Sequence, residues 1–430
     1  MRLTIHRGSH EIGGSCVEIA TATTRIVLDA GLPLVDADRQ PFDQRSIQGK
    51  TTAELLANGT LPNVSGLFDD GTRPDAILLS HAHLDHAGLL HLSRPEVPIY
   101  ATRGTSKMIL AAAVFGGQKE LDRTRHREVA PRQPFLVGDC RVTPYVVDHS
   151  TFGSVAYLVE GEGKAVLYSG DLRTHGRKPG MVRTLIAGVA PRNIDVLVME
   201  GTHFGSEQDR GTSEFELEES IVEHVRSAPA LVLASFSPLD VDRLVTFYRV
   251  AQRTGRVFVA DAYTAFVLHL VASQATIPRP TRDKGIRVFF NQGFLRRNIE
   301  NLSRLFEPDR ITLDEVLGTP EKHLMVFRPS MTTLDFDGQL PRGCRVIYSR
   351  WLGYLKNPDW VELQAQIAAA GGDFIPAHAS GHIHVADILE FVRAVNPRLV
   401  IPIHTFEPQR FAEHFPNARL LQDGEAFTIP

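Results

Sequence analysis

Cysteine is scarce in this chain, with three residues in 430, and Cys16, Cys140 and Cys344 show no CxxC spacing. A disulfide framework and a thiolate zinc site are therefore not expected. Long apolar runs are also missing, because no stretch approaches the ~18 residues that a membrane-spanning helix needs. The first residues, Met1–His6, lack the apolar core of a signal peptide. We expect a cytoplasmic protein without membrane contact.

Neither sign of charge dominates, since 46 Lys and Arg face 50 Asp and Glu for a net charge of −4. Bulk attraction to a polyanion is not expected, so any contact with nucleic acid requires a local basic cleft. A content of 43% hydrophobic and 22% charged residues is typical of a globular protein. The length of 430 residues favours two domains over one.

The most informative motif is His81-Ala-His-Leu-Asp-His86, which follows a short apolar stretch at 76–80. On an extended backbone His81 and His83 project to the same side, while Asp85 and His86 turn toward a second position nearby. One loop can therefore serve two metal ions. Imidazole and carboxylate ligands without thiolate favour zinc, manganese or iron. Ordinary surface histidines are the alternative reading, and four ligands at this spacing make it a poor one.

Two further potential ligands stand at the ends of apolar runs. His149 ends one run, and Asp171 follows another after a glycine. A two-metal hydrolase needs a bridging carboxylate and a bridging water whose lowered pKa yields a hydroxide nucleophile. We predict that Asp171 is the bridge. Asp29, at the end of the run 25–29, suits the orientation of ligands better than direct ligation.

The spacing of apolar runs predicts an α/β protein. Strands are expected in the first 200 residues at 15–20, 24–28, 76–80, 141–147, 154–159, 165–168 and 195–199, with helices at 88–92 and 106–115. Beyond residue 210 strand and helix alternate, which favours a parallel sheet. Helices are expected there at 214–227, 239–254, 263–273, 358–370 and 385–395, and strands at 230–234, 257–260, 345–348, 372–376 and 399–403.

Together these motifs resemble the metallo-β-lactamase fold. Met199-Glu-Gly-Thr-His203 resembles the acidic motif that opens a β-CASP insertion, and His378-Ala-Ser-Gly-His382 with His404 resembles its closing histidine motifs. Within that nucleic-acid-processing branch, the His-x-Ser-Gly-His form and Trp351-Leu-Gly-Tyr-Leu355 are most similar to ribonuclease J. The resemblance implies an αββα sandwich formed by residues 1–200 and 375–430, with an inserted α/β β-CASP domain at 201–374.

The resemblance also implies a function and its residues. The expected activity is hydrolysis of RNA phosphodiester bonds, from a 5′ end or internally, with two zinc ions or manganese in their place. One metal would be held by His81, His83, His149 and Asp171, and the other by Asp85, His86, Asp171 and His404.

The remaining roles concern proton transfer and phosphate binding. His382 would contact the scissile phosphate and protonate the leaving oxygen, with Glu200 orienting its imidazole. A core histidine bonded to a carbonyl is the alternative for His382. His378, Ser380 and Ser237 would bind a neighbouring phosphate, such as the 5′-monophosphate of single-stranded RNA, and Arg243 lies in the same stretch as Ser237.

Three other functions stay open. Some β-CASP proteins cut DNA, some are catalytically silent RNA-binding or scaffold subunits, and other members of the fold hydrolyse small molecules. A silent subunit generally loses ligands, and a small-molecule hydrolase does not explain the insertion. Two departures from ribonuclease J stand out, because its carboxy-terminal domain is missing and Thr405-Phe406 replaces the usual Gly-Glu. The first leaves the oligomeric state open, with a homo-oligomer among the alternatives.

Overall fold

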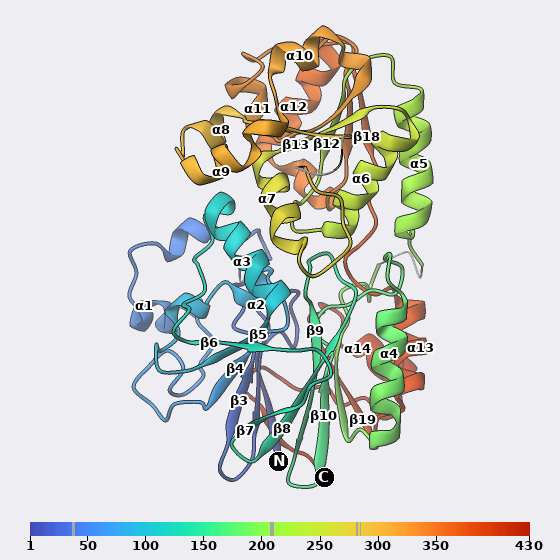
Figure 1. Ribbon diagram of the computed structural model, residues 1–430. Helices are drawn as coiled ribbons and strands as arrows, with labels where there is room; N and C mark the ends of the chain where they lie inside the picture. The colour runs from blue at the N-terminus through green and yellow to red at the C-terminus, as the bar shows by residue number, and fades with distance from the viewer. Residues whose placement is uncertain (37–38, 207–209, 281–282, 284) are drawn as a thin grey trace. The chain divides into compact units, whose positions relative to one another are not determined.

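The computed structural model describes residues 1–36, 39–206, 210–280, 283 and 285–430. The chain forms two compact units, coloured along the sequence in Figure 1. Unit 1 contains residues 1–174, 178–211 and 381–430, and unit 2 contains residues 175–177 and 212–380. The insertion was predicted at 201–374, and residues 207–209, 281–282 and 284 within that prediction lie outside the described residues.

Unit 1 contains two mixed sheets. The first has seven strands in the order β20-β1-β2-β3-β4-β5-β6 and is antiparallel from β20 to β3 and parallel from β3 to β6. Its strands are β1 (Arg2–Arg7), β2 (Cys16–Ala20), β3 (Arg25–Leu28), β4 (Ala76–Leu78), β5 (Ile99–Thr102), β6 (His126–Val129) and β20 (Ala426–Thr428).

The second sheet has six strands in the order β19-β11-β10-β9-β8-β7, and β19, β11 and β10 are parallel. These strands are β7 (Phe135–Val137), β8 (Cys140–Val146), β9 (Val155–Gly161), β10 (Lys164–Tyr168), β11 (Val196–Glu200) and β19 (Leu399–Ile403). Strand β19, from the end of the chain, pairs with β11 so that Ile403 lies opposite Glu200.

The core of unit 1 lies between the two sheets. Alternate residues of β2 and β3, such as Val17 and Ile26, pack against alternate residues of β9, β10 and β11, such as Tyr157 and Val196, and all of them are fully buried. Alternation at a period of two gives each strand one face for this core. The two sheets therefore form the inner layers of a sandwich.

Helices cover the outer faces. On the second sheet, alternate strand residues such as Leu158 and Leu197 pack against α4 (Gly180–Val189), α13 (Val385–Val395) and α14 (Gln409–His414). Beside the first sheet lie α1 (Thr52–Ala57), α2 (Leu84–Ala87) and α3 (Arg103–Gly116), as Figure 1 shows. The αββα sandwich expected from the sequence is thus confirmed.

Unit 2 is built on a seven-stranded parallel sheet in the order β15-β14-β13-β16-β12-β17-β18. Its strands are β12 (Val232–Ser235), β13 (Val257–Asp261), β14 (Ile286–Phe289), β15 (Arg310–Ile311), β16 (His323–Val326), β17 (Arg345–Tyr348) and β18 (Asp373–Pro376). The central strands are near-continuous apolar runs because helices cover both faces of the sheet.

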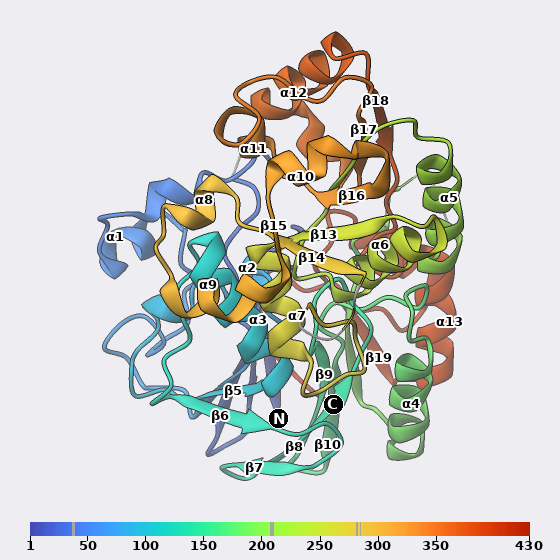
Figure 2. The same ribbon diagram turned by 45° about the horizontal axis from the view of Figure 1, so that its top comes forward.

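One face of this sheet packs against α10 (Leu313–Gly318), α11 (Pro329–Leu334) and α12 (Pro358–Ala369) through Val316, Met331 and Leu363. The helices α6 (Val241–Arg253) and α7 (Ala262–Val271) contact β13, and α5 (Glu214–Arg226) packs on α6. The remaining helices are α8 (Gln292–Leu295) and α9 (Glu300–Phe306). Figure 2 shows β13, β14 and β16 between α10–α12 and α7.

One predicted element is wrong. The pattern at 88–92 predicted a helix, but the helix α2 occupies Leu84–Ala87 and a separate 3-10 turn occupies Leu90–Leu92. The helix is therefore inside the metal-ligand motif itself. Among the described residues, no helix is long and apolar enough to cross a membrane.

Candidate metal centre

The histidine motif connects β4 to α2 in unit 1. The strand ends at Leu78, His81 and His83 follow on irregular backbone, and Asp85 and His86 lie in the first and last parts of the one-turn helix α2. The rings of His81 and His83 are perpendicular, with centroids 4.9 Å apart. This turn separates the four side chains into the pair His81 and His83 and the pair Asp85 and His86. A loop that supplies ligands to two metal ions requires such a separation.

The second carboxylate oxygen of Asp171 lies at the centre of the cluster. It is 3.1 Å from His86 Nε2 and 3.7 Å from His81 Nε2. His404 Nε2 and His149 Nε2 are 3.8 and 3.9 Å from it. Four nitrogens from three separate segments therefore surround one buried carboxylate oxygen.

The ligand atoms fall into groups that could hold a metal ion. His81, His83 and His149 form one group, and Asp85, His86, Asp171 and His404 form another, with all ligand atoms of a group within 4.8 Å of one another. A third group shares Asp171 and His404 with Glu200 and His382. All seven side chains predicted as ligands are brought together within unit 1.

Hydrogen bonds leave lone pairs pointing into this centre. His86 Nδ1 lies 2.7 Å from Asp29 and His149 Nδ1 lies 2.6 Å from the carbonyl of Gly381, and both partners can only accept. A proton therefore sits on Nδ1 of each ring, and Nε2 carries a lone pair in the neutral form of the ring that a metal ion binds. Metal-binding histidines are oriented in the same way, by donating the other ring N–H to a carboxylate or carbonyl.

Three atoms at the centre are buried without any hydrogen-bond partner: His81 Nε2, His86 Nε2 and Asp171 Oδ2. The His86 and Asp171 atoms face each other at 3.1 Å without hydrogen-bond geometry. Burying such groups unpaired is unfavourable unless a cation or proton stands between them. The donor set of the centre therefore fits divalent metal ions.

Burial would lower the pKa of His86, but Asp171 and Asp29 raise it well above 6.5, so a metal ion at Nε2 would take the place of a proton there. The electrostatics of His81 and Asp171 favour the states that metal ions bind. Burial, together with the neighbouring His86 and His149, holds the pKa of His81 well below its usual 6.5. Burial would raise the pKa of Asp171, but His404 and His86 outweigh it and hold that pKa well below 3.8. A neutral imidazole and an ionised carboxylate are the forms that ligate metal.

Asp29 orients the ligands from behind. It accepts hydrogen bonds from the amide and the hydroxyl of Ser80 at 2.7 and 2.6 Å, and from the Tyr168 hydroxyl at 2.7 Å. The Ser80 hydroxyl also lies 3.0 Å from His81 Nδ1. Asp29 has φ +61°, a left-handed conformation that is uncommon outside glycine and often marks functional sites.

Sequence reasoning missed three residues of this arrangement. Ser80 and Tyr168 bind Asp29, and the Thr202 hydroxyl lies between His404 Nδ1 at 2.9 Å and His382 Nδ1 at 3.1 Å. Ser80 directly precedes His81, Tyr168 lies three residues before Asp171, and Thr202 lies within the motif 199–203. A hydroxyl next to a ligand was the only available signal, and that signal is too common to be specific.

His382 and Glu200 form a pair beside the metal cluster. His382 Nδ1 lies 3.2 Å from Glu200 Oε2 and 3.7 Å from Asp171 Oδ2. Burial would lower the pKa of His382, but Glu200 and Asp171 raise it to about 9. Nδ1 thus lies beside a carboxylate and a hydroxyl.

The other predicted site residues lie in unit 2. His378 Nδ1 is 3.2 Å from the guanidinium of buried Arg243, which also donates to the carbonyl of Ala379 at 2.9 Å. The carbonyl of Ser380 lies 2.9 Å from His175 Nε2. Ser237 is half-buried just beyond β12, and its carbonyl accepts from the amide of Asp240.

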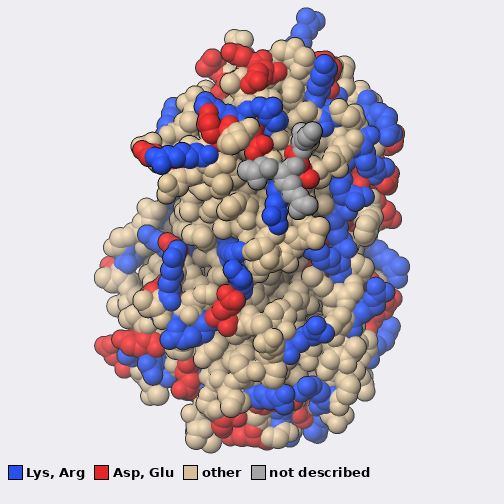
Figure 3. Space-filling model, viewed as in Figure 1, with Lys and Arg blue, Asp and Glu red and all other residues tan. Residues whose placement is uncertain are grey.

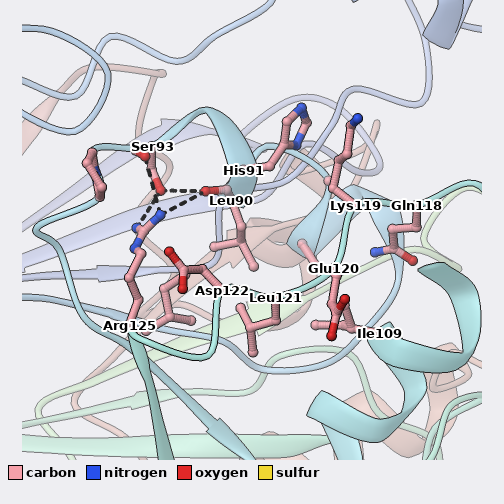
Figure 4. A pocket seen from close by; sticks show the side chains of 14 residues that line it. Leu90, His91, Ser93, Ile109, Gln118, Lys119, Glu120, Leu121, Asp122 and Arg125 are labelled. Atoms are coloured by element: carbon pink, nitrogen blue, oxygen red, sulfur yellow. Dashed lines mark hydrogen bonds between the residues drawn. The ribbon is translucent and has the colours of Figure 1, made fainter. Parts of the chain in front are cut away.

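A separate pocket of about 260 Å³ lies in unit 1 next to the 3-10 turn at Leu90–Leu92 (Figure 4). Its residue Arg125 donates to the hydroxyl of Ser93 at 2.8 Å and to the carbonyl of Val97 at 2.9 Å. Through these hydrogen bonds Arg125 stabilises the turn. The pocket lining includes none of the predicted metal ligands.

Figure 3 shows both positive and negative side chains on the visible face, with uncharged residues over much of its middle. With the fold and the donor set established, comparison with known proteins places the chain. The family described as Beta-lactamase superfamily domain matches residues 24–243, just over half of the sequence. The chain belongs to the β-lactamase superfamily.

An RNase J-like protein of Methanocaldococcus jannaschii is 27% identical over 61% of the chain and 58% of its own length. A ribonuclease J of Pyrococcus abyssi is 23% identical over 92% of the chain and 88% of its own length. The chain spans less than two thirds of the length of two curated relatives that it matches. The similarity to ribonuclease J indicated by the motifs is confirmed.

A crystal structure from Enterococcus faecalis, described as a protein of unknown function, has the same fold. It superposes with a TM-score of 0.78 over 99% of both chains at 22% sequence identity. Similarity at this level extends to the fold of the whole chain.

Proposed function

We propose that this protein is a metal-dependent ribonuclease that hydrolyses phosphodiester bonds of single-stranded RNA. The main support for this proposal is the buried Asp171 oxygen, which is surrounded by histidine nitrogens and has the His382–Glu200 pair beside it. Relatives named ribonuclease J over most of the chain support RNA as the substrate.

Two divalent cations fit the donor set. His81, His83, His149 and Asp171 would hold one, and Asp85, His86, Asp171 and His404 would hold the other. Nitrogen and oxygen donors without thiolate suit zinc, with manganese as the alternative. Bound cations supply Lewis acidity toward the phosphodiester and toward water.

The residues beside this centre would handle the proton. His382 would hold a proton on the ring and transfer it to the leaving oxygen. Glu200 and Thr202 face its Nδ1 at 3.2 and 3.1 Å and fix the plane of the ring. Glu200 is fully buried, so this orientation is held away from water. Asp29 would keep His86 and, through Ser80, His81 in their binding tautomers.

We further propose that unit 2 is a β-CASP domain that binds phosphate. His378, Ser380 and Ser237 would contact a phosphate of the RNA, including a 5′-monophosphate. Arg243 supports this role because a guanidinium can only donate, so His378 Nδ1 is the acceptor and Nε2 carries the N–H that a phosphate needs. The cytoplasmic location and a homo-oligomeric state remain predictions.

The decisive experiment is digestion of matched RNA and DNA oligonucleotides, each with a 5′-monophosphate or a 5′-hydroxyl, in the presence of zinc or manganese. We expect cleavage of RNA, and no cleavage by the Asp85→Ala variant. Asp70→Ala, at an exposed position of the same unit, serves as the matched control.

Other results would replace the proposal. Preference for DNA would make the protein a DNA nuclease. Metal binding without cleavage of any oligonucleotide would favour a silent RNA-binding subunit or a small-molecule hydrolase.

The same digestion reports the mode of cleavage. Progressive shortening from a phosphorylated end would identify an exonuclease, and internal products would identify an endonuclease.

A further inference from the structure

Three neighbouring strands of the unit 2 sheet end side by side. Beyond the last ladder pairs, the amide of Phe327 after β16 donates to Ala234 of β12 at 2.8 Å, and the amide of Ser349 after β17 donates to Ser235 at 2.8 Å. The next residues of the outer strands are Arg328 and Arg350. Two guanidinium groups therefore leave the carboxyl end of a parallel sheet on either side of β12.

Arg350 is poorly compensated. Its Nη2 donates to the carbonyl of Phe236 at 3.1 Å, and its Nε is buried with no hydrogen-bond partner. Among the described residues, the largest electrostatic influences on it come from Arg328 and three tyrosines rather than from a carboxylate. Buried Arg243 in the same unit shows the usual arrangement, with both oxygens of Glu214 accepting from it at 2.8 and 3.0 Å.

Arg328 also has an unused donor. Its Nε donates to Asp261 Oδ2 at 2.5 Å, and its guanidinium lies 5.2 Å from the centroid of the Tyr263 ring. Its Nη2 is buried without a hydrogen-bond partner. Ser235, the last residue of β12 between the two arginines, has a buried hydroxyl that is also without a partner.

The positive charges of the two arginines repel each other. Burial and the nearby charge of Arg328 lower the pKa of Arg350 to about 10. Placing two like charges within electrostatic reach while each has an unsatisfied buried N–H donor is unfavourable. An anion would satisfy the donors and neutralise the repulsion, and guanidinium forks match phosphate oxygens best.

We propose that Arg328 and Arg350 form a phosphate-binding site at the carboxyl end of the unit 2 sheet. Open parallel sheets bind ligands at this edge, beyond the ends of their strands. That the bound phosphate belongs to an RNA chain rests on the proposed function. That the site binds phosphate rests only on the two arginines. Ser237, a predicted phosphate ligand, directly follows Phe236, whose carbonyl accepts from Arg350, so the two predicted phosphate contacts lie at the same edge of the sheet.

The first test uses inorganic phosphate as the probe, with thermal unfolding measured in EDTA against chloride at equal ionic strength. We expect phosphate to raise the melting temperature of the wild type. Arg350→Gln should have a higher melting temperature than the wild type without phosphate, because a half-buried charge without a carboxylate partner is gone. It should also lose at least half of the phosphate-induced rise. Arg226→Gln, an exposed arginine of the same unit, should behave like the wild type.

A purely structural role predicts the reverse. In that case Arg350→Gln melts below the wild type without phosphate and keeps the full response, and the proposed site is overturned.

The second test uses a fluorescent 5′-hydroxyl single-stranded RNA in EDTA, with anisotropy measured over a range of salt concentrations. Loss of one phosphate contact should reduce the slope of log affinity against log salt by about 0.7, or about fivefold in affinity at 0.1 M salt. We expect this change for Arg350→Gln and not for Arg226→Gln.

The two tests separate the hypotheses. A wild type that responds to phosphate but binds no RNA would refute the ribonuclease function and keep the phosphate site. RNA binding that is identical in wild type and Arg350→Gln, without a phosphate response, would refute the site and keep the ribonuclease.

Discussion

At the residue scale, the metal centre depends on which nitrogen of each histidine carries the proton. A carboxylate, a carbonyl and a hydroxyl hold the Nδ1 atoms of His86, His149 and His81, so the Nε2 atoms face Asp171. The cost of these buried lone pairs is the physical reason to expect a cation between them. Asp29 contributes most, because two of the three rings depend on it directly or through Ser80.

Asp29→Asn tests this orientation. Asparagine is isosteric with aspartate and tolerates the left-handed backbone at φ +61°, so the fold should persist. Its amide cannot accept from Ser80, Tyr168 and His86 as the carboxylate does, and we expect metal affinity to fall about 10- to 100-fold. Titration with zinc followed by calorimetry would measure this. Unchanged affinity, matching an Asp70→Asn control, would mean that Asp29 does not orient the ligands.

At the element scale, the site is assembled from strand ends. The motif 81–86 follows β4, Asp171 follows β10, Glu200 ends β11, and His404 follows β19. β10, β11 and β19 are parallel neighbours, so their carboxyl ends meet at one edge. Most strands with strong apolar runs were predicted, although the largely apolar strands β14 and β16 were not. The edge strand β6 was also missed, because its sequence His126-Arg-Glu-Val129 is largely polar.

The strand β2 carries a buried charge that makes stability depend on pH. Burial would raise the pKa of Glu18, but His6 at 3.6 Å and Arg25 at 2.6 Å outweigh it and lower the pKa to about 2 from 4.5. A folded-state pKa below the unfolded value contributes stability above about pH 5, and that stability is lost as the pH falls toward 2. The contribution at neutral pH is about 3 kcal/mol at most.

Glu18→Gln should therefore lower the free energy of unfolding at pH 7 and narrow its difference from the wild type as the pH falls below 5. Denaturant unfolding at a series of pH values would measure both curves. Glu120→Gln removes an exposed charge paired with Arg123 and should track the wild type. A difference between Glu18→Gln and wild type that stays constant from pH 7 to pH 4 would contradict this account.

At the scale of the whole molecule, the chain leaves unit 1, forms unit 2 and returns. The last 50 residues supply the helix α13 and the strands β19 and β20. Each of these strands forms one edge of a sheet of unit 1. His382 and His404 belong to this returning segment, yet they join a cluster that begins at His81. Every predicted metal ligand therefore lies in one unit.

Metal removal should consequently destabilise unit 1 selectively. A ligand at 100 times its dissociation constant stabilises the native state by about 2.7 kcal/mol, or several degrees for a unit of this size. We expect EDTA to lower one of two calorimetric transitions and zinc to restore it. In Asp171→Asn that transition should be the same with and without zinc. A shift of both transitions, or of neither, would contradict a metal centre confined to unit 1.

The sequence by itself determined the α/β class, most strands and the chemistry of the ligands, because periodicity and contiguous histidines are local properties. It also indicated the roles of Asp171 and Glu200 through motifs at strand ends. Only the tertiary structure decided that Ser80, Tyr168 and Thr202 orient the ligands, and that Arg328 and Arg350 flank one strand. Those relationships depend on strand order, and in unit 2 the strand β16 inserts between β13 and β12. Pairing between strands far apart in sequence is set by the packing of the whole sheet, and no local pattern encodes it.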